Sequence, residues 1–405
     1  MTVEMKKYKL GDIAYITKLA GFEHSKYIQG NCSHEKRLDF IPLFIGRTVK
    51  NGCIDENFDW FIPKDISEKL PRSQLRKKCL VLPYVGTLGD MAIFYGDYDA
   101  HLGSNIAKIE LENNDCYTEE FLYYYLRSPI GQKYLLHDQQ GAIQKNITME
   151  AIRNVELPIV ELDKQKKFSA ILSTLDKRIE NLRAQNRVLE QTAKTIYDYT
   201  FLQCAGHQTT YNKTLNRNIP TNWEVKKLSD IANITMGQSP EGSSYNEIGK
   251  GKIFYQGCTD FGVMFPTPRL YTTAPTRFAK VNDILMSVRA PVGTLNIANT
   301  ECCIGRGLAA LNAKEGSNVF LYYVMKNFEN HFKNAYSIGT TFGSITKNDL
   351  YDLPVLYPDP KTLALFSTQV TPLFQKQLVN SQQIETLTTQ RNTLLPLLMT
   401  GQVKV

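Results

Sequence analysis

Several patterns that define common protein classes are absent from this sequence of 405 residues. No apolar stretch reaches the roughly 18–20 residues that a membrane-spanning helix needs, and no apolar segment follows the first lysines, so we expect neither a membrane span nor a secretory signal. The eight cysteines contain no CxxC pair, and the six histidines show no metal-ligand spacing. We therefore expect a cytoplasmic protein with reduced thiols, no metal site, and Cys302 and Cys303 as packing residues.

Motifs of the common enzyme classes are also missing. In GSSYNEIGKGK (242–252), six residues separate the first two glycines where a P-loop has four, and Lys250 precedes a glycine instead of a hydroxyl residue. GQSPEG (237–242) is not a GxSxG elbow, because its second glycine comes one position late. The sequence has no NPP[FYW] methyltransferase tetrapeptide, no glycine-rich cofactor loop and no PD…[DE]xK nuclease core. We predict a non-catalytic chain, with a methyltransferase or nuclease of diverged motifs as the least favoured alternative.

The charge is balanced rather than strongly basic. The chain carries 47 Lys and Arg against 40 Asp and Glu, which gives a net charge of +7. Residues 1–160 have a net charge of −1, so the positive excess lies in residues 161–405. This excludes a histone-like polybasic protein, and a nucleic-acid partner would require local basic surfaces.

What the sequence does contain is one long internal repeat, with a period near 200 residues. The matching pairs are KLGDIA (9–14) with KLSDIA (227–232), VGTL (85–88) with VGTL (292–295), FLYY (121–124) with FLYY (320–323), G-x5-I-T from Gly141 and from Gly339, ELPI (156–159) with DLPV (352–355), and FS (168–169) with FS (366–367). Because the order is preserved, we predict a duplicated two-part unit with a pseudo-two-fold relation. Residues 20–80 and 233–280 show almost no mutual resemblance, and variable loops on a shared scaffold usually carry function.

The first part of each unit reads as mixed α/β structure. Residues 79–96 have strand-type runs broken at Gly86 and Gly89, which suits a β-hairpin. Residues 119–136 have helical spacing, and residues 146–159 predict a short helix capped near Thr148 followed by a strand. The second copy offers the same elements over residues 283–356.

The second part of each unit is a long heptad pattern that starts at Phe168 and again at Phe366. The expected core positions are Leu172, Leu175, Ile179, Leu182, Asn186, Leu189, Ile196, and Val370, Leu373, Asn380, Ile384, Leu387, Leu394. Each helix would span about 33 residues, or roughly 50 Å. Two helices packed on separate cores remain the alternative; we favour an antiparallel pair, because a two-fold relation between copies would pair them that way.

Aligning the ends of the two helices places Asn186 opposite Asn380, and a buried Asn pair would fix the register. Pro372 and Pro396 fall early and late in the second helix, so its regular part should be shorter than that of the first.

Both variable regions combine cations, amides, hydroxyls and aromatics, which is the usual chemistry of DNA contact. The candidate DNA-binding residues are Lys26, Tyr27, Arg47, Lys50, Arg72, Ser73, Gln74, Arg76, Lys77, Gln238, Ser239, Tyr245, Lys252, Gln256, Arg269, Arg277 and Arg289. Any one of them could be an ordinary surface side chain, and RSQLRKK (72–78) could be the exposed face of a helix. Two different domains at the ends of a rod could contact major grooves about one turn (~34–36 Å) apart, which predicts a split, asymmetric target.

The sequence resembles the specificity subunit of type I restriction–modification enzymes over nearly its whole length. IPTNWEVKKLSDIANITMGQSP (219–240), DILMSVRAPVGTLNIA (283–298) and LLPLLMTGQVKV (394–405) carry the resemblance, and the first copy adds LVLPYVGTLGDMAIF (80–94) and HLGSNIAKI (101–109). The first copy lacks the family's W-x-x-x-x-L lead-in, and LEQTAKT (189–195) has no tandem copy.

The resemblance implies a non-catalytic reader of double-stranded DNA with an α+β fold, in which a long antiparallel two-helix coiled coil separates two target recognition domains. It implies assembly with two methyltransferase subunits, which bind S-adenosylmethionine and flip the target base, and with motor/nuclease subunits that use ATP and Mg²⁺. None of these cofactors should bind this chain.

We divide the chain into a first recognition domain (1–160), a central helix and linker (161–215), a second recognition domain (216–357) and a C-terminal helix (358–405). The alternative function is a structural adaptor, in which two domains on a coiled-coil strut bind proteins instead of DNA.

Overall fold

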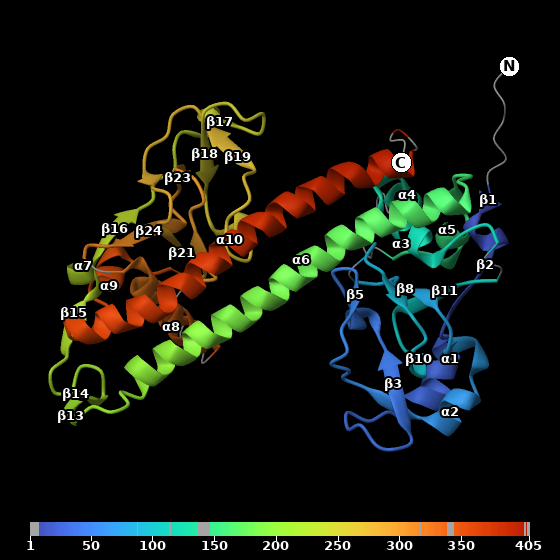
Figure 1. Cartoon of the computed structure of the whole chain (residues 1–405), viewed down its shortest axis with the longest axis horizontal. Coiled ribbons are helices and arrows are strands. Elements are labelled where there is room, and N and C mark those ends of the chain that lie inside the picture. Colours follow the sequence, from blue (N-terminus) through green and yellow to red (C-terminus); the bar gives the residue numbers. More distant parts are fainter. Residues whose placement is uncertain are drawn as a thin grey trace. The chain divides into compact units, whose positions relative to one another are not determined.

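Figure 1 shows the computed structural model of the chain, which describes residues 8–86, 88–112, 115–136, 146–315, 317–337, 344–400 and 402. The chain divides into two compact units. Unit 1 comprises Met1–Arg178 with Thr386–Val405, and unit 2 comprises Ile179–Glu385. Two long helices, α6 (Leu162–Tyr197) and α10 (Pro360–Met399), each contribute one segment to each unit.

Unit 1 contains two four-stranded sheets and several short helices. The antiparallel sheet β2-β11-β8-β9 consists of β2 (Ala14–Lys18), β11 (Ile106–Leu111), β8 (Cys79–Pro83) and β9 (Ala92–Phe94). The sheet β6-β3-β10-β7 consists of β6 (Phe61–Pro63), β3 (Phe40–Phe44), β10 (Ala100–Leu102) and β7 (Gln74–Leu75). The smaller pairs are β1 (Tyr8–Lys9) with β12 (Glu156–Leu157), and β4 (Val49–Lys50) with β5 (Cys53–Ile54). The helices are α1 (Gly21–Glu23), α2 (Lys64–Glu68), α3 (Glu119–Arg127), α4 (Pro129–Leu135) and α5 (Met149–Arg153).

Unit 2 repeats this plan. The antiparallel sheet β16-β24-β21-β22 consists of β16 (Ala232–Met236), β24 (Leu308–Ala313), β21 (Ile284–Ser287) and β22 (Leu295–Ile297). The sheet β17-β19-β18-β23-β20 consists of β17 (Tyr245–Asn246), β19 (Leu270–Thr272), β18 (Lys252–Tyr255), β23 (Cys302–Ile304) and β20 (Phe278–Ala279). The smaller pairs are β15 (Glu224–Lys227) with β25 (Pro354–Tyr357), and β13 (Thr209–Asn212) with β14 (Arg217–Pro220). The helices are α7 (Leu228–Ile231), α8 (Asn318–Ser337) and α9 (Lys347–Tyr351).

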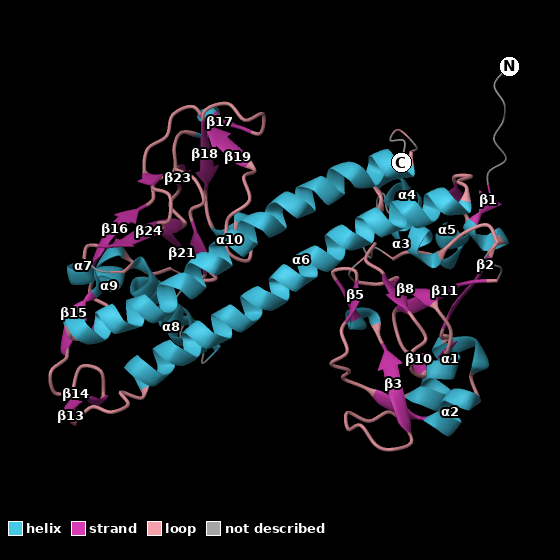
Figure 2. Cartoon of the chain, in the orientation of Figure 1, coloured by secondary structure: helices cyan, strands magenta, loops and turns pink. Residues whose placement is uncertain are grey.

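The strand order confirms the internal duplication. In each unit, one parallel contact lies inside an otherwise antiparallel sheet, between β3 and β10 in unit 1 and between β18 and β23 in unit 2. Figure 2 shows strands and helices combined in each unit, as the predicted mixed α/β class requires. Unit 2 differs by the additional edge strand β17.

Local sequence signals explain several of these elements. The run Cys79–Pro83 is buried because both faces of β8 are covered: Leu80 and Leu82 pack in one hydrophobic cluster, and Cys79 and Val81 pack in another. Strand β8 pairs with β9 in the expected hairpin. Thr148 caps α5, since its hydroxyl accepts a hydrogen bond from the Ala151 amide at 3.0 Å. Thr346 caps α9 in the same way.

Two sequence-based expectations about helices, and one alternative, are wrong. The segment 119–136 is two helices, because Ser128 leaves the helical conformation and Pro129 begins a new helix at its first turn. The segment 72–78 does not form a helix: Pro71–Ser73 is a single 3-10 turn that leads into β7. Helix α10 is longer than α6, not shorter, and it continues through Pro372, so the burial of its apolar side chains outweighs the cost of about 3 kcal/mol for an interior proline.

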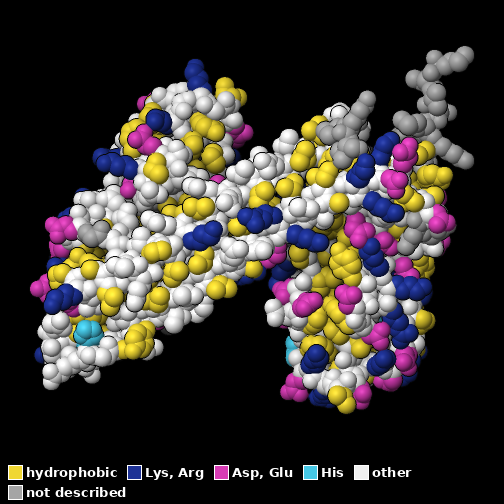
Figure 3. All heavy atoms as spheres, in the orientation of Figure 1, with side chains coloured by type: hydrophobic (Ala, Val, Ile, Leu, Met, Phe, Trp, Pro, Cys, Tyr) yellow, Lys and Arg dark blue, Asp and Glu magenta, His cyan; other side chains and the backbone are white. Residues whose placement is uncertain are grey.

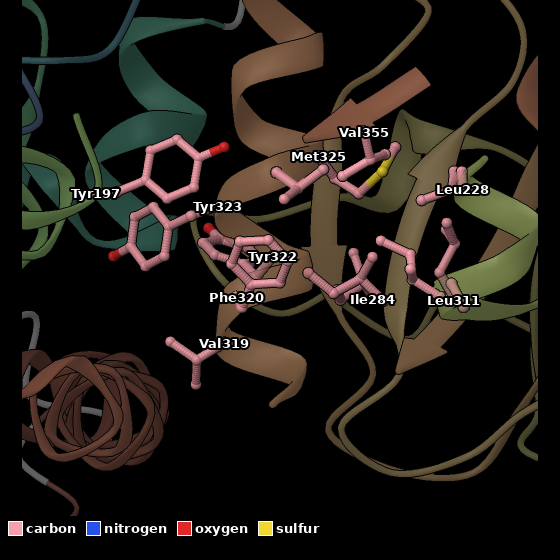
Figure 4. Close-up of a cluster of buried hydrophobic side chains, with 14 of the residues drawn as sticks. Tyr197, Leu228, Ile284, Leu311, Val319, Phe320, Tyr322, Tyr323, Met325 and Val355 are labelled. Carbon is pink, nitrogen blue, oxygen red and sulfur yellow. The ribbon is translucent and has the colours of Figure 1, made fainter. Parts of the chain in front are cut away.

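The long helices complete the core of each unit. In unit 1, Phe168 and Leu172 of α6 share a hydrophobic cluster with Leu395 and Leu398 of α10. The corresponding cluster of unit 2 contains Tyr197 and Phe366. Figure 4 shows Tyr197 beside Tyr323 of α8, with Ile284 and Leu311 of the antiparallel sheet in the same cluster. The predicted heptad core positions are all buried or half-buried.

Polar side-chain contacts join α6 to α10 within each unit. In unit 1, Arg391 Nη1 donates to Asp176 Oδ1 at 2.9 Å. In unit 2, Asn380, which is fully buried, donates to Asn186 Oδ1 at 3.0 Å, as the alignment of the helix ends predicts. Further along unit 2, Tyr197 of α6 packs against Phe366 of α10, so residue numbers rise on one segment as they fall on the other and the two segments are antiparallel within unit 2.

A tyrosine of the repeated FLYY sequence attaches α6 to the domain helix in each unit. Tyr124 donates to Asp176 at 2.9 Å, and Tyr323 donates to Glu190 at 3.1 Å. Burial raises the pKa of both Tyr124 and Tyr323, and the carboxylates of Asp176 and Glu190 act in the same direction. Both phenols therefore remain protonated donors, which preserves these contacts over the physiological pH range.

Phe366→Ala should destabilise unit 2, because Phe366 is only 1% exposed and its ring packs on two aromatic neighbours. Its ring centroid lies 5.0 Å from that of Phe201 and 6.1 Å from that of Tyr197. We expect the free energy of unfolding to fall by about 3–5 kcal/mol, measured by hydrogen exchange of the unit 2 amides. The neighbouring Leu365, 61% exposed, provides the control, and Leu365→Ala should change little. Equal effects of the two substitutions would contradict the assigned core.

Cys302 should resist alkylation in the folded protein. Burial raises the pKa of its thiol to about 12, so at pH 8 the nucleophilic thiolate is scarce as well as inaccessible. Iodoacetamide followed by peptide mass spectrometry should label the exposed Cys53 and Cys116 before Cys302. Labelling of Cys302 at a similar rate without denaturant would contradict its burial.

Candidate nucleic-acid interface

Most of the candidate cations of unit 1 are exposed but already paired. Arg47 contacts Asp59 at 2.8 Å and Lys50 contacts Asp55 at 2.7 Å. Lys26 lies 5.0 Å from the ring of Tyr27, which is half-buried against the core. Such exposed ion pairs contribute little stability, so their cations can exchange a carboxylate for a phosphate at small cost.

In the segment 72–78, the prediction of Ser73 as a DNA-binding residue is wrong. Ser73 is completely buried, so its hydroxyl is not available to DNA, and the half-buried Gln74 uses its amide to donate to the Ser67 carbonyl at 2.8 Å. Arg72 pairs with Glu23 at 2.8 Å and Arg76 lies 3.8 Å from Asp99. The exposed Lys77 is the third candidate cation of this segment.

In unit 2 the structure brings four of the candidates together around one hollow of about 250 Å³, which we call the arginine hollow. Its lining residues are Ser239, Gln256, Gly257, Cys258, Thr259, Asp260, Arg269, Arg289, Ala290, Arg306 and Gly307. Sequence analysis predicted Ser239, Gln256, Arg269 and Arg289, but it missed Asp260 and Arg306. The signal for Arg306 was its position between two glycines directly after an apolar strand.

Backbone hydrogen bonds hold the arginine hollow in shape. The Gly305 amide donates to the Tyr255 carbonyl at 2.8 Å, and the Gly307 amide donates to the Gln256 carbonyl at 3.1 Å. The Arg306 amide donates to Ser239 Oγ at 3.2 Å. A Cβ at position 307 would lie 2.6 Å from the Gln256 oxygen, so glycine is required for this close approach.

The arginine hollow has three arginines and one aspartate among its lining residues. Arg269 pairs with the buried Asp260 at 2.8 Å, and this hydrogen bond raises the pKa of the guanidinium further. Arg289 and Arg306 are exposed, and neither has an ion pair within the part of the chain that the structure describes. The hollow therefore carries a net positive charge, which suits a polyanion.

The other unit 2 candidates lie outside the hollow. Tyr245 donates to the Pro240 carbonyl at 2.9 Å and its ring packs on Phe254, so it has a structural role. Lys252 pairs with Glu301 at 2.8 Å, while Gln238 and Arg277 are exposed. Figure 3 shows Lys and Arg side chains singly or in small groups among acidic and polar ones on the face in view, without one continuous basic patch.

The equivalent positions of unit 1 carry different side chains. The Gly103 amide donates to the Phe44 carbonyl at 2.6 Å, which matches the contact of Gly305 with Tyr255. This match aligns Ile45 with Gln256 and Ser104 with Arg306. One turn geometry therefore presents an amide and a cation in unit 2 but an apolar and a small polar side chain in unit 1.

The described helices include none that is both long and apolar enough to cross a membrane. Among the described residues, His, Cys, Asp and Glu side chains form no group of three or more that could hold a metal ion.

The two α/β units, alike in strand order but different in their polar surfaces, correspond to two copies of one known domain. The sequence matches the type I restriction modification DNA specificity domain over residues 2–191 and 220–392. The chain therefore belongs to this family, with one copy of the domain in each half.

Individual relatives agree with this assignment. A Methanocaldococcus jannaschii protein named as the MjaX type I restriction enzyme specificity subunit is 31% identical, covering 78% of this chain and 76% of that protein. The MjaIX specificity subunit of the same organism is 26% identical, covering 72% of this chain and 70% of that protein. The S subunit of a type I restriction-modification system from M. genitalium shares the fold, with a TM-score of 0.61 at 17% identity over 97% of this chain and 95% of that one. The chain is a DNA sequence-recognition subunit of the type I class, not a catalytic subunit, and the adaptor alternative is not favoured.

Gly307→Ala should distort the arginine hollow, because the added Cβ collides with the Gln256 carbonyl. Overpacking typically costs about 1–3 kcal/mol, and a loss of about 1.4 kcal/mol from binding should lower the affinity for a duplex carrying the target sequence about tenfold. Gly242→Ala is the matched control, since a Cβ there meets no atom within 4 Å. Binding measured by fluorescence anisotropy should separate the two variants, and equal affinities would exclude the hollow from the interface.

Proposed function

We propose that the chain reads a split, asymmetric DNA target, with unit 1 and unit 2 each recognising one half-site. The observation that carries this proposal is the divergence of equivalent positions on one scaffold: Gln256 and Arg306 in unit 2 replace Ile45 and Ser104 in unit 1. Two surfaces of different hydrogen-bonding chemistry read different base edges, so the two half-sites should differ in sequence.

We also propose that α6 and α10 pair along their lengths as an antiparallel two-helix coiled coil between the two recognition domains. The Asp176–Arg391 contact of unit 1 and the Asn186–Asn380 contact of unit 2 fit one continuous register, which supports this arrangement. Helix α6 has 36 residues. At 1.5 Å per residue it is about 54 Å long, enough to place two domains on major grooves about 34–36 Å apart. The length of the paired helices would then set the length of the unread spacer.

The partners follow from the family. We propose that the chain assembles in the cytoplasm with two methyltransferase subunits and with motor/nuclease subunits. S-adenosylmethionine would bind the methyltransferase subunits, and ATP with Mg²⁺ the motor/nuclease subunits, so this chain itself needs no cofactor. The relatives named as type I restriction enzyme specificity subunits support this assembly.

Exchanging residues 1–160 for the first domain of another family member should change one half-site and leave the other unchanged. The exchange keeps both long helices, including Phe168 and Leu172, which help to complete the core of unit 1. Mapping methylated adenines in DNA from cells that express the chain with its modification subunits measures both half-sites. The unexchanged chain is the control, and a change in both half-sites would contradict modular reading.

A further inference from the structure

The three guanidinium groups of the arginine hollow differ in how they are held. Arg269 Nε donates to Asp260 Oδ1 at 2.8 Å, and Arg269 Nη2 lies 3.5 Å from Oδ2. The carboxylate is 5% exposed, whereas the Arg269 side chain is 51% exposed. A buried anchor therefore fixes the direction of an exposed guanidinium and neutralises its charge.

The pairing leaves one edge of the Arg269 guanidinium free. Arginine has five N–H donors in a planar fork, and Asp260 engages only the edge formed by Nε and Nη2. The outer edge, formed by Nη1 and Nη2, retains two parallel N–H groups. Such a fork matches O6 and N7 of guanine, and arginine to guanine is the commonest specific contact in the major groove.

Arg289 and Arg306 offer different chemistry from the same hollow. Both side chains are exposed; Arg306 lies in a turn and Arg289 forms an isolated β-bridge with Ser344. Neither is anchored by a carboxylate among the residues that the structure describes. An unpaired cation on a movable side chain gains most from a phosphate, because it releases condensed counterions from DNA. A neutralised pair such as Arg269–Asp260 gains little in this way, so its contribution is selectivity rather than general affinity.

We propose that Arg269, held by Asp260, reads a guanine in the half-site of unit 2, while Arg289 and Arg306 bind the adjacent phosphates. This rests on the proposed function and deepens it, because it assigns separate tasks to residues of one hollow. In unit 1, Ser104 occupies the position of Arg306, so one of the two phosphate-binding cations belongs to unit 2 alone.

Two kinds of substitution test this division of tasks in the chain assembled with its modification subunits. Arg269→Lys keeps the charge but removes the fork, so methylated-adenine mapping should show relaxed selectivity at one guanine, by about 5- to 150-fold. That position must lie in the half-site that persists when residues 1–160 are exchanged. Asp260→Asn should relax the same position. A folding defect in Asp260→Asn would leave Arg269→Lys as the decisive variant.

Arg289→Gln and Arg306→Gln should leave the methylated sequence unchanged. Each should weaken binding to a target duplex and to an unrelated duplex by the same factor, and lower the slope of log affinity against log salt by about 0.9. Arg183→Lys on α6 is the control for Arg269→Lys. This arginine is also ion-paired, its side chain is 43% exposed against 51% for Arg269, and it lies outside the hollow.

The outcomes separate the inference from the proposed function. Unchanged selectivity at every position in Arg269→Lys would overturn the inference, as would relaxed selectivity in Arg289→Gln or Arg306→Gln. Methylation of a continuous, undivided target by the wild-type complex would overturn the proposed function itself, and the inference with it.

Discussion

Burial of helix segments from distant parts of the sequence completes both α/β cores, and the rest of the structure depends on this packing. Phe168 and Leu172 join Leu395 and Leu398 in unit 1, while Tyr197 joins Phe366 in unit 2. Each side chain buried in this way contributes on the order of 1.5–3 kcal/mol. The polar contacts of Asp176 and Asn186 add direction and register to an attraction that is otherwise non-directional.

The duplicated scaffold separates folding from recognition. Gly103 in unit 1 and Gly305 in unit 2 make the same backbone hydrogen bond to the strand beside them, and this bond does not depend on the side chain of the residue that follows. Ser104 and Arg306, which follow these glycines, are exposed and take no part in the cores. Substitution at such positions alters the chemistry offered to a ligand while the buried apolar clusters remain intact.

Periodicity and repetition made much of this architecture predictable. Heptad stepping identified α6, α10 and the Asn186–Asn380 contact, and the repeated motifs identified two units of one plan, because both signals arise from contacts that follow sequence spacing. The candidate site was less predictable. The burial of Ser73 and the anchoring of Arg269 by Asp260 depend on how separate segments pack, which a local pattern does not encode. The length of α10 was misjudged for the same reason, since tertiary burial offsets the cost of Pro372.

Because the chain is made from its N-terminus, the hydrophobic cores of the two units can form at different stages of synthesis. Residues 179–385 contain every side chain of the unit 2 cluster, so that core can close while the chain is still being made. Most of unit 1 is made before unit 2, yet its core also contains Leu395, Leu398 and Met399, which follow every side chain of the unit 2 cluster in the sequence. The core of unit 1 therefore closes only after unit 2 has been made, and a chain that stops before Leu395 leaves unit 1 with an open apolar face.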